Sequence, residues 1–262
     1  MDMLPTVLIT GASSGIGAIY AERFARRGHD LVLVARDGSR LDALAARLRE
    51  GSNVTVEVLR ADLTQPDDLS AVEARLRDDA RIEVLINNAG MAQSGGFAGQ
   101  AAKDIERLIT LNITALTRLA AAVAPRFMQS GTGAIVNIGS VVGFAPELGM
   151  TIYGATKAFV LYLSQGLNLE LAPRGVYVQA VLPAATRTEI WERAGIDINT
   201  LPEVMDAGEL VDAALVGFDR RELVTIPPLH VAGRWDALDG ARQGLLSDIR
   251  QAHPAERYRS QA

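Results

Sequence analysis

The sequence predicts an α/β fold with three layers, in which helices cover both faces of a doubly wound parallel sheet. Short β-branched runs alternate along the chain with longer helical patterns rich in alanine and arginine. The runs are almost continuously apolar, which is typical of strands buried on both faces. Because crossovers between parallel strands are right-handed, such an alternation produces a doubly wound sheet.

The expected elements form one domain over residues 1–262, with a core at 5–226 and a C-terminal helical extension at 229–262. The strands are expected at 6–10, 31–35, 54–59, 84–86, 135–138, 176–182 and 223–226. The helices are expected at 15–27, 39–50, 66–79, 101–129, 152–171 and 208–219.

A last helical stretch follows the break at Pro227-Pro228. Its apolar residues fall on one face, as in an amphipathic helix. That face either packs on its own domain, which we favour, or forms a contact between subunits. The residues are Leu238, Ala241, Leu245 and Ile249.

Composition excludes several classes of protein. The chain has no cysteine, so disulfides, thiol nucleophiles and cysteine-based metal sites are excluded. Its three histidines lie far apart in sequence, and we therefore expect no metal site. A formal net charge of −5 argues against a nucleic-acid partner. We find neither a signal peptide nor a run of about 18 apolar residues, and expect a cytoplasmic protein without a membrane partner.

A glycine-rich turn follows the first expected strand, with the sequence TGASSGIG at Thr10–Gly17. Gly11 permits a tight turn, Gly15 lets the backbone approach a pyrophosphate, and Gly17 lets the next helix lie close to the sheet. The helix N-terminus then offers unpaired N–H groups to phosphates. The glycine spacing differs from that of the common dinucleotide fingerprint, so a turn without a ligand stays the alternative.

The end of the second strand bears on the choice between NAD and NADP. An acidic residue there would hold the ribose 2′-hydroxyl of NAD, but the position is Ala35. Arg36 and Arg40 follow and can bind a 2′-phosphate. The alternative is that both arginines merely solvate the start of a helix. Asp37 weakens this argument. We predict NADP rather than NAD, and Asp62 could receive the adenine amino group or serve as a loop residue or cap.

Tyr153 and Lys157 are four residues apart in a helical pattern, which places them on one face. A free phenol, with a pKa of about 10, is a poor base at neutral pH. A nearby ammonium group, with a cationic nicotinamide, would lower that pKa. Lys103 is the chain's other lysine, whereas arginine supplies all the remaining basic residues. A lysine beside a tyrosine in such a chain indicates a required amine rather than chance spacing.

Two polar residues complete the predicted site. Ser140 ends the fifth strand, where the carboxyl ends of strands line a ligand crevice, and could hold the substrate oxygen. It could also be a cap or turn residue. Asn112 is a poor residue for a helix interior, so we expect a local distortion there. Its amide either holds a water that links Lys157 to solvent or is satisfied by the backbone.

These residues together resemble the short-chain dehydrogenase/reductase (SDR) family in its single-domain form. The resemblance covers about residues 5–226 and rests on the glycine turn, on Asn87-Asn88-Ala89-Gly90, on Pro183 followed by Thr188, and on the four polar residues above. It implies a seven-stranded Rossmann sheet and a catalytic tetrad of Asn112, Ser140, Tyr153 and Lys157. One departure is Ala184, where the family usually has glycine.

The resemblance also implies that the backbone around Asn88–Gly90 lines the cofactor, that Thr188 holds the nicotinamide carboxamide, and that the protein is a homodimer or homotetramer. The family's subunit interface commonly uses the helices that carry Asn112 and Tyr153. With the residues argued above, the predicted cofactor-binding set is Gly11, Ser13, Ser14, Gly15, Ile16, Gly17, Arg36, Arg40, Asp62, Leu63, Asn88, Ala89, Gly90, Tyr153, Lys157, Pro183 and Thr188.

The predicted activity is an NADP(H)-dependent interconversion of a carbonyl compound and its alcohol, with Tyr153 as acid and base. Loops after the fourth, fifth and sixth strands carry an apolar set, which favours a fairly apolar ketone or aldehyde. One alternative is a non-catalytic dinucleotide-sensing protein, and another is a non-redox epimerase or dehydratase. The apolar residues are Met91, Phe97, Phe144, Met150, Trp191 and Met205, some of which could instead pack on one another.

Overall fold

The computed structural model describes residues 4–259 of the chain. Contacts divide it into two compact units, the first ending at Pro228 and the second beginning at Leu229. The first unit contains the sheet and every residue predicted for the site. The predicted core ended at 226, close to this division.

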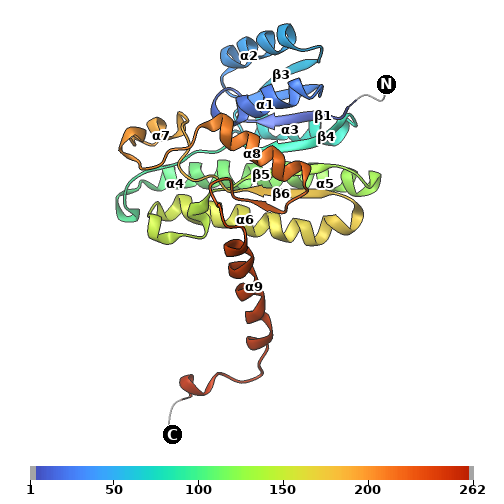
Figure 1. The fold of residues 1–262 in the computed structure, drawn as a ribbon. Coiled ribbons are helices and arrows are strands. Elements are labelled where there is room, and N and C mark those ends of the chain that lie inside the picture. The colour runs from blue at the N-terminus through green and yellow to red at the C-terminus, as the bar shows by residue number, and fades with distance from the viewer. Residues whose placement is uncertain (1–3, 260–262) are drawn as a thin grey trace. The chain divides into compact units, whose positions relative to one another are not determined.

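Among the described residues, seven parallel strands form one sheet in the order β3-β2-β1-β4-β5-β6-β7 (Figure 1). The order reverses between β1 and β4, and ligands of such sheets bind at this switch point, outside the carboxyl ends of the strands. The strands are β1 (Thr6–Thr10), β2 (Leu31–Ala35), β3 (Val56–Arg60), β4 (Ile82–Asn87), β5 (Ala134–Ile138), β6 (Tyr177–Val181) and β7 (Val224–Thr225).

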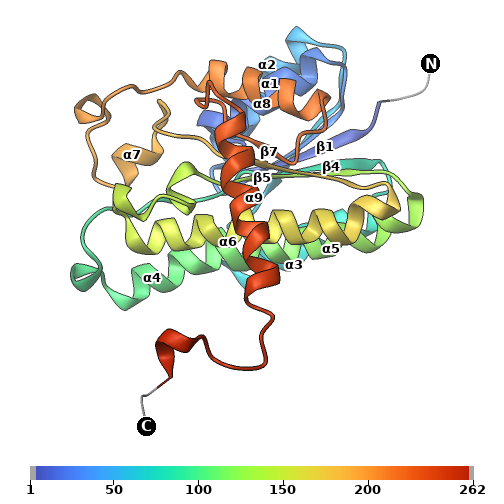
Figure 2. The same ribbon diagram turned by 60° about the horizontal axis from the view of Figure 1, so that its bottom comes forward.

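Helices cover both faces of the sheet (Figure 2). The strand pattern explains why, because successive side chains point to opposite faces. In β1, Val7 and Ile9 belong to one buried cluster and Leu8 to the other. The first cluster is covered by α1 (Gly15–Arg26), α2 (Gly38–Gly51) and α8 (Ala207–Asp219). The opposite face carries α3 (Pro66–Asp78), α4 (Ala102–Ile109), α5 (Leu116–Ser130) and α6 (Thr151–Leu171).

A single helical stretch runs from Ala102 to Ser130 and contains the distortion predicted around Asn112. Residues Thr110–Ala115, between α4 and α5, form one turn of π-helix. By length and composition alone this stretch could span a bilayer, a criterion that buried helices of water-soluble proteins also meet. Here it packs against α3 and α6, as a core helix does.

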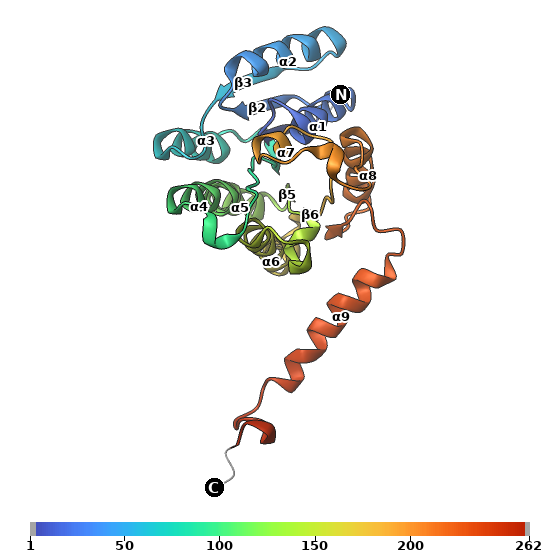
Figure 3. The same cartoon turned by 90° about the vertical axis from the view of Figure 1, so that its left-hand side faces the viewer.

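The structure adds elements that periodicity does not reveal. The short helix α7 (Ile190–Arg193) lies in the long segment between β6 and α8. Figure 3 looks onto the edge where the strands end and shows α7 in front of the sheet. This segment therefore runs along the side of the sheet at which a ligand is expected.

The second unit contains α9 (Gly233–Asp248). No residue of this helix is buried, and Leu238 and Leu245 are at least half exposed. Within this unit the predicted apolar face is therefore uncovered. That this face packs on its own domain stays a prediction.

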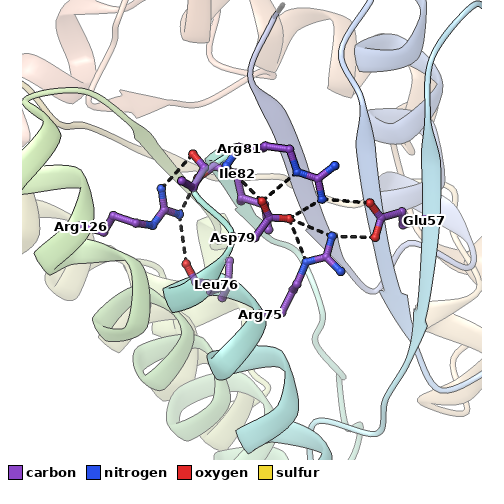
Figure 4. Close-up of polar contacts among 8 residues, drawn as sticks. Glu57, Arg75, Leu76, Asp79, Arg81, Ile82 and Arg126 are labelled. Atoms are coloured by element: carbon purple, nitrogen blue, oxygen red, sulfur yellow. Dashed lines mark hydrogen bonds and ion pairs between the residues drawn. The ribbon is translucent and has the colours of Figure 1, made fainter.

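A cluster of ion pairs holds the start of β4 (Figure 4). Asp79 accepts hydrogen bonds from Arg75 and Arg81, and both arginines also bind Glu57 on β3. The hydrogen bond from Arg81 and its charge hold the pKa of Asp79 at about 2, against the opposing effect of burial. The cluster thus joins α3, β3 and β4 far from the carboxyl ends of the strands.

Candidate active site

The glycine turn has the backbone conformation that its sequence predicts. Gly11 and Gly15 have φ angles of +66° and +55°, a region that side chains disfavour. A Cβ atom at Gly11 would also lie 2.8 Å from Nδ2 of Asn88. At Gly17 a Cβ atom would collide with the carbonyl oxygen of Gly11, so α1 begins close to the turn, as expected.

Hydrogen bonds join this turn to the residues that follow β4. The Thr10 hydroxyl accepts from the backbone N–H groups of Asn88 and Ala89, at 3.0 Å each. The Asn88 side chain donates to the carbonyl oxygens of Thr10 (2.9 Å) and Gly11 (3.2 Å). The two motifs therefore form one rigid floor at the switch point of the sheet.

A cavity of about 340 Å³ lies above this floor. It collects most of the predicted cofactor-binding residues from five separate parts of the chain. They are Gly11, Ser13, Ser14, Gly15, Ile16, Arg36, Asp62, Leu63, Asn88, Ala89, Gly90 and Thr188.

Five predicted cofactor residues lie outside the lining of this cavity: Gly17, Arg40, Tyr153, Lys157 and Pro183. Gly17 contributes to the site indirectly, because its lack of a side chain lets α1 pack close to the turn. The cavity also has lining residues that the sequence analysis did not identify. Among them are Arg107 on α4 and Glu189, Ile190 and Arg193, which follow β6.

The end of the cavity beside β2 carries Arg36, one of the two predicted arginines. Arg36 lines it, and its positive charge contributes to lowering the pKa of Asp62. Burial acts against this lowering, whereas hydrogen bonds from Thr64 favour it. Both the backbone N–H and the hydroxyl of Thr64 donate to Oδ1 of Asp62, at 3.0 and 2.7 Å. Asp62 is thus an ionised carboxylate on the cavity wall.

Arg40 is already engaged by carboxylates. Its Nη1 donates to both carboxylate oxygens of Glu189, at 2.9 and 2.7 Å. Its Nε lies 3.4 Å from Asp37, which caps α2 by accepting from the Arg40 N–H. The sequence gives no sign of the first contact, because the partners are 149 residues apart.

At the other end of the site, α6 and the residues after β5 bring the predicted catalytic groups together. Tyr153 and Lys157 lie one turn apart on the buried face of α6, with exposed fractions of 9% and 6%. The 3-10 turn Val141–Gly143 packs against this helix. Ser140 caps that turn and is hydrogen-bonded through its hydroxyl to the side chain of Tyr153.

Burial is the main influence on the Tyr153 phenol. It raises the pKa of Tyr153 to about 12, although the hydrogen bond with Ser140 acts to lower it. The sequence analysis expected Lys157 and a cationic nicotinamide to lower this pKa together. In the chain by itself, desolvation of the phenolate is the larger effect, and the phenol is protonated at neutral pH. The joint effect of Lys157 and a cationic nicotinamide stays a prediction.

Lys157 is held by the strand below it. Its Nζ donates to the carbonyl oxygen of Ile138, at 2.8 Å, and lies 5.6 Å from the centre of the Tyr153 ring. Burial lowers the pKa of Lys157 to about 8. The amine is therefore close to its titration point near neutral pH, which is unusual for a lysine.

Asn112 joins the segment after β4 to α6. Its Nδ2 donates to the carbonyl oxygen of Met91, and its Oδ1 accepts from the N–H of the same residue, both at 2.9 Å. Nδ2 also donates to the Thr156 hydroxyl, at 3.1 Å. These contacts agree with the alternative in which the backbone satisfies the amide, and the water link to Lys157 stays a prediction. Oδ1 of Asn112 and Nζ of Lys157 would lie 3.4 and 3.6 Å from a Cβ atom at Gly90, so both face that residue.

The segment after β6 approaches the glycine turn. A Cβ atom at Gly15 would be 3.2 Å from Cγ2 of Thr188. Pro183, at the base of the segment, accepts a hydrogen bond from the Ser140 hydroxyl at 3.2 Å. The carbonyl oxygen of Thr186 accepts from the indole N–H of Trp191, at 2.8 Å. This segment therefore spans from Ser140 to the cavity above the glycine turn.

The apolar loop residues divide into two groups. Phe97 and Phe144 are 60% and 39% exposed. Met91 lines the cofactor cavity, whereas Met205 packs against the main hydrophobic cluster. Met205 is thus a partly buried residue that packs on the core, as the packing alternative allows.

The sequence pattern described as short chain dehydrogenase matches residues 5–198. A short-chain dehydrogenase from Sphingobium yanoikuyae, solved in complex with NADPH, is 85% identical, with a TM-score of 0.97 over 98% of this chain and 100% of that one. A bulky-bulky ketone specific alcohol dehydrogenase from Comamonas testosteroni is 72% identical, with a TM-score of 0.92 over 98% and 99%.

A more distant relative is the very-long-chain 3-oxoacyl-CoA reductase of Bos taurus, which is 36% identical over 187 residues. The match covers 70% of this chain and 60% of the bovine protein, so the chain spans about three fifths of that relative. The fold and the family expected from the sequence are both confirmed. The chain belongs to the short chain dehydrogenase family.

Proposed function

We propose that the protein is an NADP(H)-dependent oxidoreductase that interconverts a fairly apolar ketone or aldehyde and its alcohol. The observation that carries this proposal is the buried hydrogen bond between Ser140 and Tyr153, with Lys157 one turn away. This group of side chains adjoins the cavity above the glycine turn, since Nζ of Lys157 faces Gly90 in the cavity lining. A dinucleotide sensor would have no need of such a buried acid.

NADPH, when bound, supplies a hydride to the carbonyl carbon. The backbone of the glycine turn and the N-terminus of α1 would bind its pyrophosphate, because they offer N–H groups and small side chains. Thr188 would hold the nicotinamide carboxamide. The Sphingobium relative in complex with NADPH supports this choice of cofactor.

The proton is moved by this chain's own residues. Ser140 orients the carbonyl oxygen, and the Tyr153 hydroxyl donates its proton to that oxygen as the alcohol forms. A pKa of about 12 keeps Tyr153 protonated before the reaction, which suits reduction. The Lys157 ammonium then stabilises the phenolate that is left. In the reverse direction, the phenolate accepts the proton of the alcohol.

Selectivity for NADP comes from Arg36, at the cavity end beside Ala35. The guanidinium can make charge-assisted hydrogen bonds to a 2′-phosphate. Arg40 is a second candidate ligand, although Glu189 holds it in the structure. Asp62 lines the same end and could receive the adenine amino group.

The substrate we propose is a ketone with two bulky substituents. The Comamonas relative, described as specific for such ketones, supports this, and so do the exposed side chains of Phe97, Phe144 and Leu148. The test is a graded series of ketones, from acetone to diaryl ketones, measured by oxidation of NADPH. We expect kcat/KM to rise with the size of both substituents. Activity confined to small or charged carbonyl compounds would contradict the substrate, and no oxidation with any of them would contradict the activity.

We further propose that the protein is a cytoplasmic homodimer or homotetramer. In support, Tyr162 and Leu169 on α6 are both 78% exposed, and Phe159 lies on the same face. Apolar side chains seven and three residues apart form one helical stripe, which suits a subunit contact. Light scattering gives the mass in solution, and Tyr162→Asp should lower it. A monomeric parent protein would contradict this assembly.

A further inference from the structure

The segment from Arg187 to Gly195 borders two hollows of the molecule. Thr188, Glu189, Ile190 and Arg193 line the cofactor cavity, and the outer side of the same segment lines a second, shallower hollow. Any movement of this segment therefore changes the shape of the cofactor cavity and of the surface next to it.

The segment is fastened differently at its base and at its far end. At the base, Thr186 pairs with Met205 in a short parallel bridge, and Trp191 donates to the Thr186 carbonyl oxygen. Farther along, the Ser94 hydroxyl donates to the carbonyl oxygen of Ala194. On the cofactor side, Glu189 binds Arg40 of α2. That ion pair joins the segment to the part of the molecule where a 2′-phosphate is expected.

Arg40 has two competing kinds of anionic partner. In the structure its charge is paired with Glu189 and, less closely, with Asp37. A 2′-phosphate carries a charge of nearly −2 and accepts bidentate hydrogen bonds from guanidinium groups. The pair of Arg40 with Glu189 is 49% and 41% exposed, and exposed ion pairs contribute little free energy. A 2′-phosphate within reach of Arg40 would therefore displace the carboxylate of Glu189.

Glu189 would not be left unpaired by such an exchange. Its carboxylate also accepts from Nη2 of Arg193, at 2.6 Å, one helical turn farther along its own segment. Losing Arg40 thus leaves the negative charge of Glu189 compensated within the segment itself. The carboxylate of Glu189, which would otherwise present a negative charge to the phosphates of a dinucleotide, stays paired with Arg193.

We propose that Glu189 occupies the place of the 2′-phosphate on Arg40, and that NADP(H) binding exchanges one anion for the other. The exchange releases the segment 187–195 from α2, whereas NADH leaves the ion pair intact. Glu189 is then a positioning residue that couples the identity of the cofactor to this segment. The inference rests on the proposed function, in which a 2′-phosphate binds beside Arg36.

Glu189→Gln tests the exchange, with Glu192→Gln as the matched control. Glu192 carries the same charge on the same segment, but within residues 4–259 it is not the ion-pair partner of Arg40. Relative to the control, we expect Glu189→Gln to tighten NADPH about two- to fivefold and to leave NADH unchanged. The dissociation constants come from quenching of intrinsic fluorescence. Unchanged or weaker NADPH binding, or equal tightening of both cofactors, would overturn the exchange.

A second arm separates this inference from the proposed function. In an Arg40→Ala background, Glu189→Gln should no longer alter NADPH binding, because the competition is gone. If Glu189→Gln still tightens NADPH binding in the Arg40→Ala background, the effect comes from the charge of Glu189 alone, and the exchange is overturned. Arg36→Ala should weaken NADPH in either case. If Arg36→Ala leaves the affinity for NADPH unchanged, the proposed phosphate site is contradicted instead.

Trp191 reports the release of the segment directly. In a Trp235→Phe variant, Trp191 is the remaining tryptophan of the chain. We expect adenosine 2′,5′-bisphosphate to change its emission, and 5′-AMP, which lacks the 2′-phosphate, to leave it unchanged. Adding Glu189→Gln should produce the changed emission before any nucleotide is added. Equal responses to both nucleotides would show that the segment does not sense the 2′-phosphate.

Discussion

Ser140 and Tyr153 are hydrogen-bonded through their side-chain hydroxyls, one at the end of β5 and the other on α6. The contact places a hydroxyl with a fixed position beside a phenol that burial keeps protonated. Ser140 is in turn fixed by the carbonyl oxygen of Pro183, which begins the segment over the site. Tyr153, Ser140 and the segment after β6 are thus joined by hydrogen bonds into one connected unit.

Lys157→Arg is expected to abolish most activity and to weaken cofactor binding. The amine is 6% exposed and bonded to the Ile138 carbonyl oxygen, so the wider, planar guanidinium does not fit the same place. The control is Lys103→Arg, at an exposed position on α4. Steady-state kinetics and NADPH titration measure both effects. Full activity in Lys157→Arg would mean that charge alone matters there.

The same lysine predicts a pH dependence of stability. Burial lowers the pKa of Lys157 to about 8, from 10.5, so between these values the unfolded chain binds more protons than the folded one. The free energy of unfolding should therefore rise with pH across this interval, by roughly 3 kcal/mol at most. Urea unfolding of the parent and of Lys157→Met, from pH 7 to 10.5, isolates the effect. Parallel curves for the two proteins would contradict it.

Asp79→Asn is expected to lower the free energy of unfolding at neutral pH by about 1–2 kcal/mol, because it breaks the pairs with Arg75 and Arg81. The pKa of Asp79 lies at about 2, so this contribution is present above pH 4 and is lost as the pH falls toward 2. Asp78→Asn, at the exposed neighbouring position, is the control. Equal losses in both variants would show that the cluster adds nothing specific.

Much of the site could be predicted because its chemistry depends on local sequence. Three of its signals are local in the sequence. They are the glycine turn, the four-residue spacing of Tyr153 and Lys157, and the polar side chain of Asn112 inside a helical pattern. Periodicity gave the strands to within about two residues at their ends. The π-helical turn at 110–115 confirms the distortion expected at Asn112.

The remaining features depend on contacts that no local pattern encodes. Arg40 meets Glu189 only because the chain folds the segment after β6 back over α2. The four-residue helix α7 is too short to produce a periodic signal. The rise of the Tyr153 pKa to about 12 in the chain by itself could not be predicted, because the sequence reveals a neighbouring charge but not the extent of burial.

Ala35→Asp combined with Arg36→Ala is expected to reverse the preference for NADPH over NADH. The change adds an acceptor for the ribose 2′-hydroxyl and removes a donor to the phosphate. One charge-assisted hydrogen bond is worth about 1.5–3 kcal/mol, so the ratio of kcat/KM should shift at least tenfold. A preference for NADPH that survives would mean that Ser13, Ser14 or Arg40 holds the phosphate.

Tyr153→Phe tests the proposed mechanism most directly, because it removes one oxygen atom from the buried face of α6. The matched control is Tyr162→Phe, which makes the same change at an exposed position of the same helix. The measurement is kcat for ketone reduction beside the dissociation constant of NADPH. We predict that Tyr153→Phe lowers kcat by a factor on the order of 10²–10⁴ while NADPH binding stays nearly unchanged. Near-normal turnover in Tyr153→Phe would contradict Tyr153 as the proton donor.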